Sequence, residues 1–195
     1  MIVPYAWVDE VEPAAPDIVA AWRGIEEGRS IELRRMIRSK AGFGTAERTS
    51  AQLAVLAAAL GDLLTDLPDA LLREPGGEAD WNVAETVGHV SDARAGLALA
   101  AAKAAAGAWP SDAPSVVPGI AGSPDADRAA LLHGIARSQR IIERSARTVV
   151  GHETEPCPLE HPLVGRLRCG EWLLFAGVHD LMHLEQLHGL AEGAR

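Results

Sequence analysis

Two histidines near the C-terminal end of the chain, His179 and His183, have the spacing of a metal-binding pair. Side chains four residues apart on a helix lie on one face, one turn apart, so both rings can reach the same ion. Large apolar residues share this face, and the pair is therefore expected to point into the protein. A buried polar ring without partners costs roughly 1–3 kcal/mol, and one shared cation would satisfy both rings. Because the chain has seven histidines, a pair at this spacing also arises by chance.

His89 is a candidate for a third ligand. It lies seven residues after Asn82, at the flank of an apolar valine stripe in a segment that predicts a helix. The alanine-rich surroundings leave this face poorly defined, so the spacing does not decide whether His89 points inward. Three imidazoles would leave an ion at least one open position for water or substrate, as in catalytic zinc sites. Nitrogen ligands suit zinc, nickel, copper or ferrous iron and disfavour magnesium and calcium.

Five further residues are candidates for substrate binding or for support of the ligands: Trp81, Glu85, Arg94, Trp172 and Gln186. Glu85 lies one turn before His89 and could orient it or act as a base, although a role in capping the helix is the simpler interpretation. Arg94 interrupts an apolar stripe, so it either extends to the edge of the protein or binds an anionic substrate. Gln186 either hydrogen-bonds a ring or a bound ligand or has a purely packing role. The two tryptophans either pack in the core or line a cleft.

Other reactive side chains are weaker candidates. Asp180 and Glu185 are expected on a solvated face. Cys169 stands at the start of a predicted helix, where the helix dipole could lower the pKa of its thiol, although a small buried or capping residue is the simpler interpretation and no catalytic role is assigned to it. Cys157 and His161 suggest a second metal site only faintly, because no second cysteine lies at the spacing of a zinc ribbon.

Helical patterns dominate the chain and predict four long helices. Over residues 46–66 leucines recur at steps of three and four, with Thr45 as a candidate cap and Pro68 as a stop. A second helix opens at Asn82, where Glu85 completes a capping box, and runs through an alanine-rich tract to Gly107. Two more are expected over about 125–150 and 170–191. Four such amphipathic helices predict an all-α protein built as a four-helix bundle.

The remaining segments are expected to connect or flank the bundle. Residues 108–124 are too rich in proline, glycine and serine for a helix or a paired strand and predict a long connection. Residues 151–169 predict a second irregular stretch, and no segment shows convincing strand alternation. Residues 1–44, with short helical patterns at 17–27 and 30–40, are expected to form an N-terminal extension that packs on a bundle domain of residues 45–195.

Composition narrows the classes of function. A chain of 195 residues that is 48% hydrophobic and 23% charged is long enough and apolar enough to fold around a core. Its net charge of −9 disfavours nucleic acid and anionic membranes as partners. No segment has the length and hydropathy of a membrane span, and the N-terminus lacks the basic region of a secretory signal. With only two cysteines, a reducing cytoplasmic location is expected.

Two motifs resemble the DinB/YfiT-like superfamily. Residues 81–90, WNVAETVGHV, are similar to the Trp-(Ser/Asn)-x-x-Glu-x-x-x-His entry to the second helix of that family. Residues 171–186 are similar to its C-terminal helix, in which His-x3-His is followed by x2-Gln. The two motifs occur in the family's order, and the resemblance covers about residues 45–192. Residues 1–44 depart from the usual pattern and leave open whether they cover the metal cleft or extend a dimer contact.

The resemblance implies a four-helix bundle, often a homodimer, with one divalent ion held by His89, His179 and His183. Family members bind zinc, nickel or iron, and the better-understood ones are transferases or isomerases that use low-molecular-weight thiols such as bacillithiol or mycothiol. Others resemble metal-dependent hydrolases. The first hypothesis is therefore a cytoplasmic metal-dependent enzyme acting on a small molecule. The alternative is a non-catalytic module that binds metal or a partner protein in a stress response.

Overall fold

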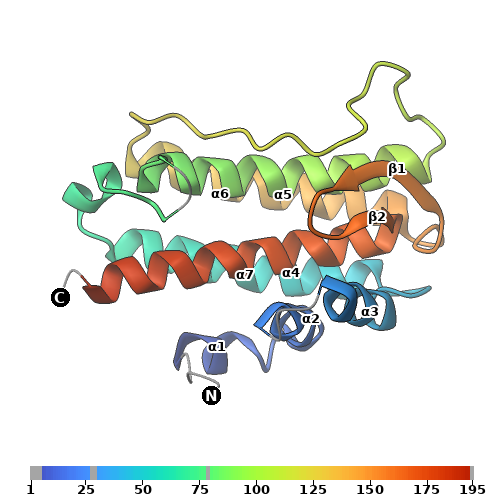
Figure 1. Ribbon diagram of the computed structural model, residues 1–195, viewed down its shortest axis with the longest axis horizontal. Coiled ribbons are helices and arrows are strands. Elements are labelled where there is room, and N and C mark those ends of the chain that lie inside the picture. Colours follow the sequence, from blue (N-terminus) through green and yellow to red (C-terminus); the bar gives the residue numbers. More distant parts are fainter. Residues whose placement is uncertain (1–5, 27–29, 78–79, 194–195) are drawn as a thin grey trace.

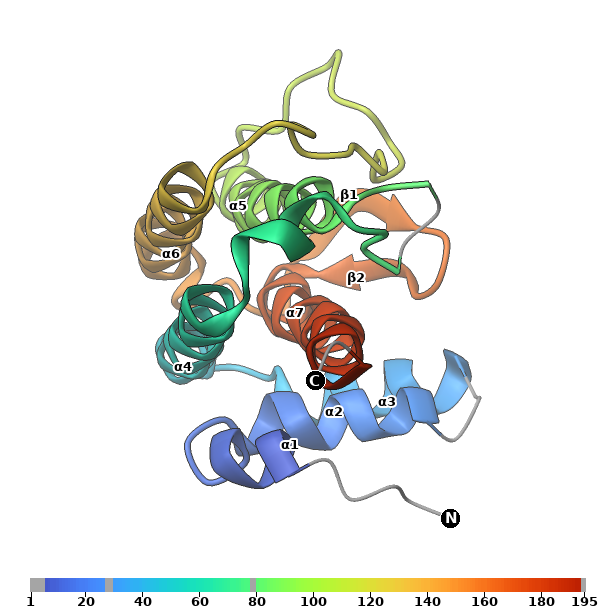
Figure 2. The ribbon, with the colours of Figure 1, turned by 90° about the vertical axis from the view of Figure 1, so that its left-hand side faces the viewer.

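Four long helices form the body of the protein (Figure 1); the computed structural model describes residues 6–26, 30–77 and 80–193. The helices are α4 (Ala46–Asp66), α5 (Val83–Ala105), α6 (Arg128–Val149) and α7 (Cys169–Gly193). Both α4 and α5 pack against α6 and α7, so the four helices stand at the corners of a bundle (Figure 2). This arrangement confirms the predicted all-α bundle. Within the described ranges, no helix combines the length and the apolar composition that crossing a membrane requires.

Side chains at the first turns fix where two of these helices begin. At α5 the predicted capping box is present: the Glu85 N–H donates to Asn82 Oδ1 over 2.8 Å, and the Asn82 N–H donates to Glu85 Oε2 over 2.9 Å. The predicted cap of α4 is wrong, because the Thr45 hydroxyl donates to a preceding backbone carbonyl instead. A carboxylate distant in sequence takes that place, since the buried side chain of Glu153 accepts from the Ala46 N–H over 3.4 Å.

The N-terminal segment adds a layer of short helices below the bundle in Figure 2: α1 (Ala6–Val11), α2 (Pro16–Glu26) and α3 (Ser30–Lys40). Helices α2 and α3 correspond to the two predicted helical patterns, and both contact α7. Gly177 of α7 permits the close packing of α2, because a Cβ there would lie 2.5 Å from the Ile18 side chain. This layer covers α4 and α7, on the side away from the long connection that follows α5 (Figure 2).

Asp17 joins α2 to α4. Its carboxylate accepts hydrogen bonds from Arg48 Nε and Gln52 Nε2, each over 2.8 Å, and Lys40 Nζ lies 3.7 Å away. Burial acts to raise the pKa of Asp17, but the hydrogen bonds from Gln52 and Arg48 and the charges of Arg48 and Lys40 outweigh it and leave the pKa lowered. The carboxylate is therefore ionised at neutral pH and attaches the N-terminal layer to the bundle.

The second predicted irregular stretch contains a hairpin, which corrects the expectation of no strands. Strands β1 (Pro156–His161) and β2 (Gly165–Arg168) pair antiparallel, with Glu160 opposite Arg166. Side chains of β1 alternate between exposed and buried, with Cys157 and Leu159 on the inner face. Only two inward residues carry this alternation, and three prolines interrupt the sequence around them, so the local pattern resembles a loop. The hairpin packs on α5 and α7.

Residues 108–124, which we call the strap, form the predicted long connection and run back along α5 without regular structure (Figure 1). Two backbone hydrogen bonds attach its middle to β1: Val117 N–H to the Glu160 carbonyl, and Glu160 N–H to the Ser115 carbonyl. Its end lies on the first turns of α5, where a Cβ added to Gly88 would lie 2.8 Å from Gly122 Cα. Glycines at both positions therefore permit the contact between strap and helix. The 3-10 helix η1 (Asp69–Arg73) connects α4 toward α5.

Candidate metal centre

Three histidine rings from α5 and α7 converge inside the bundle. Nε2 of His179 lies 3.3 Å from Nε2 of His89 and 3.3 Å from Nε2 of His183. One ligand atom from each ring falls within 4.8 Å of the others. Among the described residues, no other group of three or more histidine, cysteine or acidic side chains is placed to hold an ion. His89 therefore points inward, a question that its sequence position left open.

The spacing of these nitrogens suits a small divalent ion. Two imidazole nitrogens that each lie about 2.0–2.1 Å from a tetrahedral ion are about 3.3 Å apart. Both distances from His179 Nε2 have this value. His179 and His183 are only 9% and 4% exposed, so little water competes for their nitrogens, whereas His89 is half-buried. The donor set is entirely nitrogen, which favours zinc, nickel or iron over magnesium and calcium.

Hydrogen bonds on the far side of two rings fix which nitrogen faces the centre. The Nδ1–H of His89 donates to the Ile120 carbonyl over 2.8 Å, and the Nδ1–H of His183 donates to Gln186 Oε1 over 2.8 Å. A neutral imidazole carries one proton, so Nε2 of each ring presents a lone pair to His179. His179 can donate a proton to only one of them, which leaves lone pairs opposed at 3.3 Å. A cation at this point removes that repulsion, and such orienting partners are usual around metal-binding histidines.

Burial keeps the third ring neutral as well. Desolvation, followed by the neighbouring rings of His183, His89 and His161, holds the pKa of His179 well below its usual value. The neutral form is the one that binds metal. Nδ1 of His179 is buried and has no hydrogen-bond partner among the described residues. This side of the cluster therefore differs from His89 and His183, whose Nδ1 atoms both have acceptors.

The candidate supporting residues fall into different environments. Gln186 contacts His183, as described above, and the Trp81 ring packs against His89 with centroids 4.9 Å apart. Glu85 is engaged in the capping box at the start of α5. Trp172 is fully buried in the core against Phe175. It does not line the pocket that lies between α5 and the strap and includes His89 in its wall.

Arg94 occupies neither of its two predicted environments. Its side chain is 0% exposed, and its Nε lies 2.7 Å from Oδ2 of Asp180, which is 1% exposed. The guanidinium also donates to the Leu53 carbonyl, Ser138 Oγ and Gln139 Oε1. A single side chain on α5 therefore contacts α4, α6 and α7, and it has no free hydrogen-bonding edge for a substrate.

The expectation that Asp180 lies on a solvated face is likewise wrong. Burial raises the pKa of Asp180 to about 7, and the charge and hydrogen bonding of Arg94 act in the opposite direction. The sequence does contain an indication of this ion pair, because Asp180 is the only acid in residues 172–184 and Arg94 interrupts an apolar stripe. Two opposite charges on apolar faces are expected to pair when both faces enter one core. In contrast, no sequence pattern indicates that the Ile120 carbonyl orients His89.

The thiols take no part in the centre. Both cysteines are free and buried. Burial, with smaller contributions from Cys157 and Glu155, raises the pKa of Cys169 to about 12, so Cys169 is the small buried residue of the two alternatives and not a thiol activated by the helix dipole. His161 packs on Phe175 with ring centroids 4.8 Å apart, and its Nδ1 accepts from the Leu163 N–H.

The fold and the site together define a four-helix bundle with a candidate mononuclear centre of three histidines. The family model described as the DinB superfamily matches residues 35–187, a range that includes α4 to α6 and all three histidines. The chain belongs to the DinB superfamily. No curated protein and no solved structure matches it.

Proposed function

We propose that this chain is a metal-dependent enzyme that acts on a small molecule by thiol transfer or isomerisation, or by hydrolysis. The observation that carries the proposal is the convergence of three Nε2 atoms, with two Nδ1–H groups directed away from the centre by the Ile120 carbonyl and Gln186. The ligands His89, His179 and His183 would hold zinc, nickel or iron. The sequence resemblance to thiol-dependent transferases and to metal-dependent hydrolases supports the two reaction classes.

The chemistry follows from the number and type of the ligands. Three neutral imidazoles leave a divalent ion at least one position for an exogenous group, in contrast to a closed structural site. In that position the ion would lower the pKa of a water molecule or a thiol. The chain's own part is to hold the rings in one tautomer and to exclude bulk water around them. Trp81, packed on His89, contributes to that shielding.

Metal content tests the ligand set. Purified wild-type protein is expected to carry about one zinc, nickel or iron ion per chain, and His89→Ala is expected to lose it. His133→Ala is the matched control, because His133 lies exposed on α6 outside the cluster. Unchanged metal content in His89→Ala would overturn the three-histidine site.

A thermal-shift screen with bacillithiol, mycothiol and glutathione tests the reaction class. A thiol at free concentration c that binds the folded, metal-loaded protein stabilises it by RT ln(1 + c/Kd), so its Tm rises as the thiol concentration exceeds the dissociation constant. Selective stabilisation by one thiol, lost in His89→Ala, is the result expected for a transferase or isomerase. If no thiol shifts the Tm, the transferase branch is excluded and hydrolysis remains.

The cytoplasmic location and the homodimer are part of the same proposal. Two free, buried cysteines, Cys157 and Cys169, fit a reducing compartment. Light scattering of the purified protein at several concentrations tests the dimer, for which a mass of one chain would be the contrary result.

A further inference from the structure

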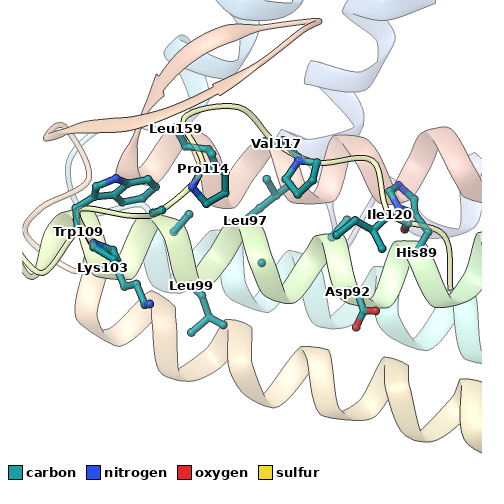
Figure 3. A pocket seen from close by; sticks show the side chains of 16 residues that line it. His89, Asp92, Leu97, Leu99, Lys103, Trp109, Pro114, Val117, Ile120 and Leu159 are labelled. Carbon is teal, nitrogen blue, oxygen red and sulfur yellow. Dashed lines mark hydrogen bonds between the residues drawn. The ribbon is translucent and has the colours of Figure 1, made fainter.

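A pocket of about 350 Å³ lies between α5 and the strap, and His89 forms part of its wall (Figure 3). The floor is one face of α5, where Ala93, Gly96 and Ala100 recur at steps of three and four. Small side chains at these positions keep the floor low, and a Cβ added to Gly96 would meet no atom within 4 Å. The volume is within the range of small-molecule sites in proteins.

The strap forms a roof with few polar groups. Pro110, Pro114 and Pro118 recur every four residues, and all three line the pocket. Proline has no backbone N–H, so these positions bring no unsatisfied donor to an apolar cavity. The hydrogen bonds of the strap to β1 and to His89 hold the roof in place. The pocket is therefore formed by the folded chain itself and requires no closing motion.

The two ends of the pocket differ in chemistry. His89 stands at one end, and Lys103 and Trp109 stand at the other (Figure 3). Lys103 follows His89 by fourteen positions along α5, which corresponds to about 21 Å at the helical rise. No described carboxylate lies within ion-pair distance of Lys103, whereas Asp92, also on the pocket wall, pairs with Arg137 at 3.4 Å. Among the described residues that line the pocket, Lys103 thus carries a charge for which no described residue supplies a counter-ion.

We propose that this pocket binds an elongated amphipathic molecule, with an apolar chain along α5, an anionic group at Lys103 and its other end against His89. The apolar lining from α5, the strap and Leu159 matches the alkyl chain, and Lys103 matches the anion. Residence of the molecule in the pocket stands independently of catalysis. Only the further step, in which the end at His89 meets the metal and reacts, rests on the proposed function.

Calorimetric titration of the purified full-length protein with dodecanoate, below its micellar concentration, tests the proposal. Dodecyltrimethylammonium has the same chain and the opposite charge. Dodecanoate is expected to bind more tightly than the cation. Lys103→Gln is expected to lower the affinity for dodecanoate by about two- to fivefold, as for the loss of an exposed ion pair. Absence of dodecanoate binding, tighter binding of the cation, or indifference to Lys103→Gln would each overturn the proposed ligand class.

A pair of glycine variants tests where the alkyl chain of dodecanoate binds. Gly96→Phe places a ring in the open space above the floor of the pocket. It should lower the affinity for dodecanoate by about tenfold or more, because excluding two methylene groups from the pocket already costs that much. Gly189→Phe is the control, since that glycine of α7 is also exposed, meets nothing within 4 Å and does not line the pocket. Equal binding by the two variants would overturn the location. Metal content, measured on the same samples, reports failure of the proposed function separately from failure of the pocket.

Discussion

Replacement of Arg94 by methionine is expected to destabilise the protein strongly, although the two side chains are similar in length. Arg94 is 0% exposed, and the Asp180 carboxylate 2.7 Å away is 1% exposed. Removing one partner of a buried ion pair leaves the other charge without compensation and costs about 3–5 kcal/mol. A typical domain has about 5–15 kcal/mol of stability in total, so the variant should lose about a fifth of it or more.

Replacement of the other partner, Asp180→Leu, should lower the free energy of unfolding by at least as much. The guanidinium of Arg94 cannot lose its proton, whereas a buried carboxyl can gain one and become neutral. The double variant Arg94→Met/Asp180→Leu removes both charges and should therefore be less destabilised than the sum of the two single variants. This non-additivity distinguishes the loss of a charge pair from a simple loss of packing.

Urea unfolding followed by circular dichroism measures these differences. Arg137→Met is the matched control, because Arg137 is likewise paired with an aspartate, Asp92, at 3.4 Å, but both side chains are about 60% exposed. Its loss should cost less than about 1 kcal/mol. The reasoning is refuted if Arg94→Met unfolds at the same urea concentration as Arg137→Met, or if the double variant equals the sum of the single ones.

Three further perturbations test the surroundings of the site and the N-terminal layer. Gly88→Ala should weaken metal binding by about 10- to 100-fold, because its Cβ would lie 2.8 Å from the strap and displace the carbonyl that orients His89. Gly96→Ala is the control and should bind metal normally, because no atom lies within 4 Å of its new Cβ. Calorimetric titration of both variants with zinc measures this difference. Gln186→Leu removes the acceptor for a ligand ring and should likewise lower metal affinity by about 10- to 100-fold with far-ultraviolet dichroism unchanged. Asp17→Asn should destabilise the fold at pH 7 by less than about 1 kcal/mol. Since the pKa of Asp17 is lowered on folding, its contribution is lost as the pH falls through the folded pKa, and urea midpoints of variant and wild type should converge well below pH 3.8.

Several features followed from short-range patterns alone. The leucine steps of α4, the capping box of α5 and the four-residue spacing of His179 and His183 each depend on residues within one or two turns of each other. Helical geometry converts such spacing directly into a shared face, whatever the rest of the chain does. The DinB-like motifs were visible for the same reason, since one covers the start of α5 with its cap and the other lies within α7.

The inward direction of His89, the Ile120 carbonyl that orients it and the pairing of Arg94 with Asp180 were decided only by the tertiary structure. Each contact joins residues 31 to 90 positions apart, so its existence depends on how the helices and the strap pack. The cap of α4 by Glu153 is of the same kind, because the acceptor lies 107 positions from the helix N-terminus, and so is the attachment of the hairpin, whose Glu160 pairs with the strap at Ser115 and Val117. Local sequence sets which faces are apolar, whereas the burial of those faces against one another determines which polar groups must meet.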